Sequence, residues 1–124
     1  MLTNSDPMTF VATVKPEAAK RFYAETLGLR LVSDDQFAIV FDLHGTMLRM
    51  EKVQALQPQP FTVLGWKVRD IASTMAGLAK RGVRFERYDG LPQDEHGVWT
   101  APGSGARVAW FKDPDGNTLG ISQH

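Results

Sequence analysis

The chain has 124 residues, 43% of them apolar, which is enough for one packed domain over residues 1–124. Its 14 basic and 14 acidic side chains cancel, which argues against a nucleic-acid or anionic-membrane partner. The absence of cysteine excludes disulfides and thiolate metal sites, so we expect a cytoplasmic protein.

The first half of the chain predicts a strand, a helix and three more strands. Residues 1–7 lack the basic and apolar regions of a signal peptide, and no later segment has the apolar length to span a bilayer. Residues 8–14 alternate loosely and are rich in Val, Thr and Phe, as strands are. Pro16 suits a first helical turn, and Gly28 is expected to end that helix as a left-handed cap. The remaining strands are expected at residues 29–33, 37–41 and 46–53.

The second half predicts the same order of elements. Residues 54–60 contain two prolines and no periodicity, which indicates a linker. A strand is expected at residues 61–68, followed by a helix that Asp70 caps and Gly82 ends. Between the later strands, residues 88–105 carry four glycines and two prolines, and a loop of this length is usually functional or mobile. Those later strands are expected at residues 83–87, 106–112 and 118–122.

Two features of the sequence recur, which indicates an internal repeat. The turn at residues 42–46 (DLHGT) resembles residues 113–117 (DPDGN). A valine and a glycine flank each expected helix at the same spacing, as Val14 with Gly28 and Val68 with Gly82. The chain therefore divides into module one, residues 8–53, and module two, residues 61–122, joined by the linker 54–60. A module of this size would be marginally stable alone, so we expect the two to share one core.

Three motifs give the sequence a family resemblance: Arg21-Phe22-Tyr23, Leu27-Gly28, and the closing Trp110-Phe111-Lys112-Asp113-Pro114-Asp115-Gly116-Asn117. With them, residues 8–121 resemble the vicinal oxygen chelate superfamily of glyoxalase I, bleomycin- and fosfomycin-resistance proteins and extradiol dioxygenases. The resemblance implies an α+β fold in which two βαβββ modules form an incomplete eight-stranded barrel around a cupped site, often completed in a homodimer. Pairing of the modules within one chain and exchange between two copies both stay open.

Metal-using members of the superfamily hold a divalent ion with His, Gln or Glu side chains on four strands. The family motifs place the corresponding positions at Thr9, Arg49, Val63 and Gly120. The repeat agrees, because Thr9 and Val63 differ by 54 positions and Arg49 and Gly120 by 71. Val and Gly offer no ligand, Thr is a poor one, and a guanidinium repels a cation. The neighbouring positions supply no imidazole or carboxylate, so we predict no metal cofactor, with a divalent ion as the alternative.

Arg49 is the most informative of the candidate site residues. If the family alignment holds, Arg49 lies inside the cup, with Glu51 two positions on along the same face of the strand. A planar guanidinium there would recognise a carboxylate, phosphate or enolate on a small ligand. An Arg–Glu ion pair, or an arginine reaching to the rim, is the structural alternative.

Aromatic and acid–base residues complete the candidate set. Trp110 is expected near Gly120 across the closing hairpin, filling the space of the usual Glu, although core packing also explains a strand Trp. Trp99 on the long loop is taken as a ligand-binding residue. His96, beside Asp94 and Glu95, is a weak catalytic candidate on a loop that could close over a ligand, or a solvated loop residue. Asp113 and Asp115 lack the spacing of a calcium loop and are expected to form a turn.

Two functions fit these residues. The first is a metal-free protein, resembling bleomycin-resistance proteins, that sequesters a small molecule in an aromatic cup containing Arg49 and acts as a homodimer. The second is a metal-dependent lyase, isomerase or dioxygenase with a non-standard ligand set that uses His96 or Glu51. A structural or regulatory protein without a pocket is a third class. The sequence names neither a substrate nor a ligand.

Overall fold

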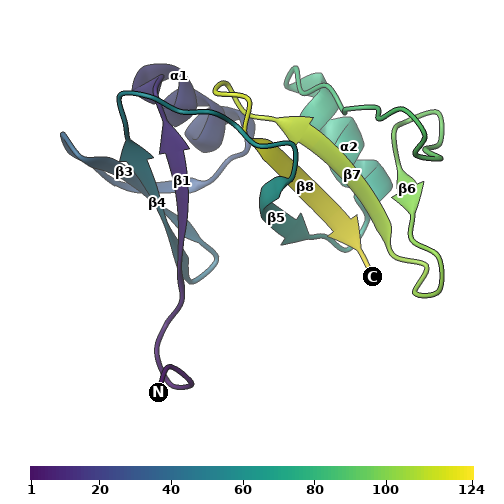
Figure 1. The fold of residues 1–124 in the computed structure, drawn as a ribbon, viewed down its shortest axis with the longest axis horizontal. Helices are drawn as coiled ribbons and strands as arrows, with labels where there is room; N and C mark the ends of the chain where they lie inside the picture. The colour runs from purple at the N-terminus through teal and green to yellow at the C-terminus, as the bar shows by residue number, and fades with distance from the viewer. The chain divides into compact units, whose positions relative to one another are not determined.

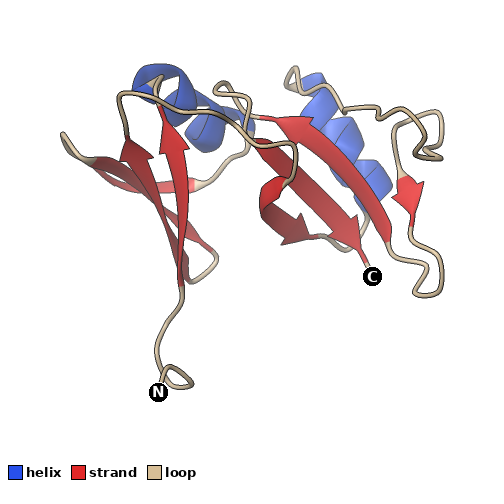
Figure 2. Ribbon diagram, in the orientation of Figure 1, coloured by secondary structure: helices blue, strands red, loops and turns tan.

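The computed structural model describes residues 1–124, which form two compact units, residues 1–57 and residues 58–124. Each unit holds one four-stranded sheet and one helical segment (Figures 1 and 2). Neither helical segment has the length and apolar character needed to cross a membrane. The strand order is the same in both sheets: the first strand lies beside the fourth, followed by the third and the second. The predicted α+β fold of two equivalent modules with eight strands is confirmed, and neither sheet is closed.

The first unit follows the predicted order closely. Its elements are β1 (Met8–Thr13), α1 (Pro16–Arg21), the π-helical turn η1 (Phe22–Thr26), β2 (Arg30–Asp34), β3 (Ala38–Leu43) and β4 (Thr46–Lys52). Pro16 begins the helix, and Gly28 follows it with a φ of 73°, as predicted. β1 runs parallel to β4, whereas β3 is antiparallel to both of its neighbours.

The core of the first unit lies between its helical segment and one face of its sheet. Tyr23 is fully buried, with its ring centroid 5.9 Å from that of Phe41 on β3. Ile39, Leu48 and Met50 are also fully buried and share this face, because the strand register places them opposite one another. Burying side chains of this size stabilises a fold by about 1.5–3 kcal/mol each. The alternate positions of these strands therefore point to the other face, which no helix of this unit covers.

Asp34 at the end of β2 connects three elements of the first unit. Its carboxylate accepts hydrogen bonds from Lys20 Nζ of the helix at 2.9 Å and from Lys52 Nζ of β4 at 2.7 Å. These two bonds, that from Lys52 first, hold the pKa of Asp34 below its ordinary value. The ion pairs fix the ends of β2 and β4 against α1. β4 is also the strand that carries Arg49.

Acidification is expected to weaken the first unit through Asp34. Because the folded-state pKa is depressed, the stabilisation is present above the unfolded-state pKa and is lost as the pH falls through the folded-state pKa. Urea unfolding followed by circular dichroism between about pH 3 and 6, at low salt, measures this loss. Asp34→Asn should show a shallower acid limb than the wild type, and equal pH dependence of the two proteins would contradict the assignment.

The second unit comprises β5 (Thr62–Lys67), α2 (Ile71–Lys80), β6 (Trp99–Thr100), β7 (Arg107–Lys112) and β8 (Thr118–Gln123). Asp70 caps α2 as predicted, since its side chain accepts a hydrogen bond from the backbone N–H of Ser73 at 3.1 Å. The N–H of Ile71 donates to the side-chain oxygen of Gln123 at 2.8 Å, which ties the start of α2 to β8. Ile71 is fully buried, as are Leu119 and Phe111 to within 1%, so α2 covers this face of the sheet.

The predicted strand at residues 83–87 is wrong, and the fourth strand of this sheet is β6 instead. Residues 83–87 meet β7 at a single bridge, between Phe85 and Phe111. Beyond it, the amide of Gln93 donates to the carbonyl of Glu86 at 2.9 Å and accepts from the N–H of Tyr88 at 2.8 Å. A side chain thus takes backbone groups that a strand would pair with its neighbour. The rest of the edge of β7 pairs with β6, which lies inside the predicted loop 88–105.

Both predicted turns are confirmed. In the first, His44 and Gly45 have φ angles of 53° and 101°, and the Asp42 carboxylate accepts from the N–H of Gly45 at 2.8 Å. In the second, Gly116 has a φ of 89°, and Asp113 Oδ1 accepts the N–H groups of Asp115 and Asn117, each at 2.9 Å. Asp113 therefore serves the turn that the sequence indicated.

Candidate functional site

The face of the second sheet opposite α2 carries one tryptophan beside two glycines. Trp110 alternates with the buried Ala109 and Phe111, so its side chain points away from α2. The register places Gly120 opposite Trp110, and Gly65 of β5 opposite Gly120. A Cβ added to Gly120 would lie 3.4 Å from Cδ1 of Trp110. The indole therefore covers Gly120, as the sequence predicts.

Three aromatic side chains, Tyr88, Trp99 and Trp110, form an aromatic wall on this face. The Trp110 ring lies 5.6 Å from Tyr88 in an edge-on arrangement and 6.1 Å from Trp99 in a tilted one. The indole N–H of Trp110 donates to the hydroxyl of Thr62 on β5 at 3.1 Å, which fixes the ring plane. Burial, with a smaller contribution from Glu86, raises the pKa of Tyr88. Its phenol is therefore a neutral hydrogen-bonding group at physiological pH.

A shallow cavity of about 240 Å³ lies on this face between β5, β7 and β8. Trp110 and the two glycines contribute to its lining, together with Val108 and the polar residues Thr62, Lys67 and Ser122. Because Gly65 is exposed and has no side chain, a flat molecule can approach the backbone of β5 here. Ligand sites commonly have a volume of about 300–1,000 Å³, so this cavity fits a small ring system or part of a larger one.

Gln93 holds the loop that carries Tyr88. Besides its bonds to Glu86 and Tyr88, its amide nitrogen donates to the carbonyl of Gly97 at 2.8 Å. One side chain thus connects both ends of the loop between residue 86 and residue 97. The sequence reasoning missed Tyr88, Thr62 and Gln93 as site residues. Of these three residues, only Tyr88 could have been found from the sequence, because it is a second aromatic residue on the loop that carries Trp99.

His96 is separated from the aromatic wall. It lines a different cavity, formed by α2 and residues 83–98 on the other side of the sheet. Its Nε2 lies 3.5 Å from Oε1 of Glu95, and both side chains are largely exposed. The Asp94 carboxylate accepts the backbone N–H groups of Val98 and His96, each at 2.9 Å, and the bond from Val98 above all lowers the pKa of Asp94. Asp94 is therefore a loop-forming residue, and the structure joins Trp99 with Trp110 but leaves His96 elsewhere.

Arg49 and Glu51 lie in the first unit, on the face of β4 that points away from α1. Arg49 lies opposite Phe10 in the β1–β4 register and is half-buried, whereas Glu51 is exposed. No ion pair forms between them, so the alternative of an Arg49–Glu51 pair is not observed. Hydrogen bonds from the backbone N–H groups of Ala38 and Phe37 lower the pKa of Asp35. The charge of Arg49 makes a smaller contribution in the same direction.

The observed register moves two of the four predicted metal positions, by one residue in the first unit and by two in the second. β1 pairs Thr9 with the buried Leu48, so Phe10 rather than Thr9 shares the face of Arg49. In the second unit the register shifts between Thr62 and Leu64, which leaves Val63 unpaired and aligns Gly65 with Gly120. The first sheet has no such shift between β1 and β4, and this irregularity breaks the constant spacing expected from the repeat.

The corrected positions still do not fit a divalent ion. Phe10, Gly65 and Gly120 have no side-chain donor atom for a metal, and Arg49 carries a fixed positive charge. No group of three His, Cys, Asp or Glu side chains in the structure is arranged to hold a metal ion. The donor set at these four positions thus differs from the His, Gln and Glu set that the family resemblance implies.

The fold and these motifs have a clear family match. A family model described as the Glyoxalase/Bleomycin resistance protein/Dioxygenase superfamily matches residues 7–121. The chain belongs to this superfamily. The match confirms the resemblance carried by the Phe22-Tyr23 helix and the closing hairpin. No curated protein matches the sequence.

Solved structures of superfamily members have the same fold. A member from Sphaerobacter thermophilus DSM 20745 is 24% identical, with complete coverage of both chains and a TM-score of 0.76. TnmS3, an antibiotic binding protein from Streptomyces sp. CB03234, is 26% identical over 99% of this chain and 98% of its own, with a TM-score of 0.72. A lactoylglutathione lyase from Agrobacterium tumefaciens is 19% identical over 98% of this chain and 95% of its own, with a TM-score of 0.68.

Proposed function

We propose that this superfamily member binds a planar aromatic small molecule on the aromatic wall, without a metal ion and without transforming it. The observation that carries the proposal is the partly exposed cluster of Tyr88, Trp99 and Trp110 beside two glycines, where the superfamily's metal ligands are missing. The similarity to the antibiotic binding protein TnmS3, at 26% identity over nearly the whole chain, supports binding as the function.

The wall offers a ligand two kinds of interaction. A flat ring stacks on the indole of Trp110, and aromatic pairs contribute about 0.5–1.5 kcal/mol beyond the area that they bury. The hydroxyl groups of Tyr88 and Thr62 supply hydrogen bonds at the edges of the ring system. Separately, we propose Arg49 as an anion-recognising residue of the first unit, because it is half-buried and forms no ion pair.

Replacing Trp110 with alanine is expected to weaken binding of anthracene-9-carboxylate by about tenfold or more, because the stacking surface is lost. Quenching of tryptophan fluorescence in a titration measures the affinity. Phe37→Ala is the control for the loss of an aromatic side chain, since Phe37 is 64% exposed between β2 and β3 and does not line this cavity.

Equal affinity of the wild type and Trp110→Ala would overturn the proposal. So would consumption of a bound compound, followed by chromatography, because the protein would then be an enzyme. The metal-dependent alternative gains no support from the donor sets described above. A homodimeric state and a cytoplasmic location stay predictions of the sequence.

A further inference from the structure

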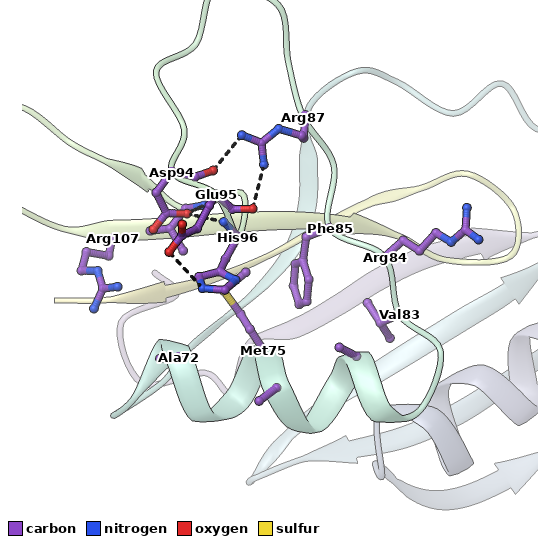
Figure 3. Close-up of a pocket in the computed structure, with 13 residues that line it drawn as sticks. Ala72, Met75, Val83, Arg84, Phe85, Arg87, Asp94, Glu95, His96 and Arg107 are labelled. Carbon is purple, nitrogen blue, oxygen red and sulfur yellow. Dashed lines mark hydrogen bonds and ion pairs between the residues drawn. The ribbon is translucent and has the colours of Figure 1, made fainter.

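A second cavity lies on the opposite face of the second sheet from the aromatic wall. It has a volume of about 710 Å³, within the range of ligand-binding sites. α2 forms its floor, and residues 83–98 form its roof (Figure 3). Since Arg107 alternates with Val108 and Trp110 along β7, the sheet itself separates this cavity from the wall. The two sites can therefore be occupied independently.

The floor of the cavity is apolar and leaves room for a ligand. The helix presents Ala72, Ala76 and Ala79 there, each exposed although apolar. Met75 and Phe85 point into the space between helix and roof, with His96 above Met75 (Figure 3). Small side chains on the helix beside larger ones from the roof produce a hollow rather than a packed contact. The apolar part of a ligand would gain burial against this surface.

The charged groups around the cavity leave an excess of positive charge. The Arg87 guanidinium donates to the backbone carbonyls of Asp94 at 2.7 Å and Glu95 at 3.4 Å, so it is committed to the roof. The Asp94 carboxylate is likewise bound to the backbone of its own loop, and Glu95 lies beside His96. Arg84 and Arg107 line the same cavity and form no ion pair.

We propose that this cavity is a second binding site, for an amphipathic organic anion. Its apolar body lies against Ala76, Ala79 and Phe85. Arg84 and Arg107 lie on opposite sides of the cavity (Figure 3), so its carboxylate or sulfonate group is held by one of these two arginines. Guanidinium groups bind such anions through paired, charge-assisted hydrogen bonds. The site goes beyond the proposed function, because it uses none of the residues of the aromatic wall.

Cholate is the probe that tests the site in a calorimetric titration, because it combines a carboxylate with an apolar body that has no aromatic ring to stack on the wall. Saturable binding to the wild-type protein is expected. The double variant Arg84→Gln/Arg107→Gln should bind about tenfold more weakly or worse, since hydrogen bonds to charged groups contribute about 1.5–3 kcal/mol each. Ala76→Phe should weaken binding to a similar degree, because its ring fills the floor of the cavity. This variant does not change β7, so it tests the site even if the loss of Arg107 impairs folding.

Two controls separate this site from other surfaces. Arg69→Gln/Lys80→Gln removes the same charge outside the cavity, and Trp110→Ala alters the opposite face. Both should bind the probe within about twofold of the wild type. Lack of saturable binding to the wild type would overturn the proposal. It would also be overturned if Trp110→Ala abolished binding, or if neither the double variant nor Ala76→Phe weakened it.

Discussion

Replacing Asp113 with alanine is expected to lower the free energy of unfolding of the second unit by about 2–4 kcal/mol. The Asp113 side chain is 6% exposed and accepts hydrogen bonds from the N–H groups of Asp115 and Asn117 and from the side-chain amide of Asn117. Alanine would leave three donors without this acceptor inside a tight turn. Each buried donor that loses its partner costs about 1–3 kcal/mol, and partial access of water reduces the sum.

The internal repeat supplies the matched control. Asp42 occupies the equivalent turn in the first unit, but its carboxylate accepts one backbone N–H, that of Gly45, and lies 3.7 Å from the exposed Arg30. Asp42→Ala is therefore expected to cost about 1 kcal/mol or less. All three tryptophans lie in the second unit, so tryptophan fluorescence during urea unfolding reports Asp113→Ala, and circular dichroism reports both variants. Equal losses in the two variants would contradict this account of the turn.

Placing a glutamate at position 120 is expected to abolish binding on the aromatic wall without creating a metal site. A Cβ there would lie 3.4 Å from Trp110 and 3.5 Å from Cγ2 of Thr62, so a longer side chain must displace the indole. Gly120 is buried, so a carboxylate at this position would lose hydration. We expect affinity for anthracene-9-carboxylate to fall by more than about tenfold.

The same variant tests the metal question. Neither the wild type nor Gly120→Glu should retain a stoichiometric amount of Mn²⁺, Fe²⁺, Ni²⁺ or Zn²⁺ after desalting, because a single carboxylate beside Gly65 and Trp110 does not make a ligand set. Metal content measured by mass spectrometry checks this. Gly77→Glu, on the exposed side of α2 with no atom within 4 Å of an added Cβ, is the control. Retention of metal by the wild type would return the protein to the metal-dependent members.

Local chemistry made several features predictable from the sequence. Pro16 and Gly28 mark the ends of the first helical segment because proline lacks a backbone N–H and glycine accepts a positive φ. Asp70 caps α2, and Asp42 and Asp113 form turns, because a short carboxylate bonds to N–H groups two to four residues on. The approach of Trp110 to Gly120 also followed, since a short hairpin fixes its own register.

Features that depend on contacts between distant residues could not be predicted from the sequence. Residues 83–87 have the composition of a strand, yet the Gln93 amide binds the Glu86 carbonyl and the Tyr88 N–H, and β6 pairs with β7 instead. The register shift near Val63 depends on how β5 meets β8, and no local signal marks it. His96 looked like part of a binding loop because it lies three positions from Trp99 in the sequence.

The sequence by itself determined the two modules and their turns and caps, because each depends on residue type and short-range bonding. Only the tertiary structure decided which side of the second sheet each loop residue serves. It brings Tyr88 and Trp99 to Trp110 and places His96 with α2. The physical reason is that a strand directs successive side chains to opposite faces, so the pairing of β6 and the bonds of Gln93 select the site that each residue joins.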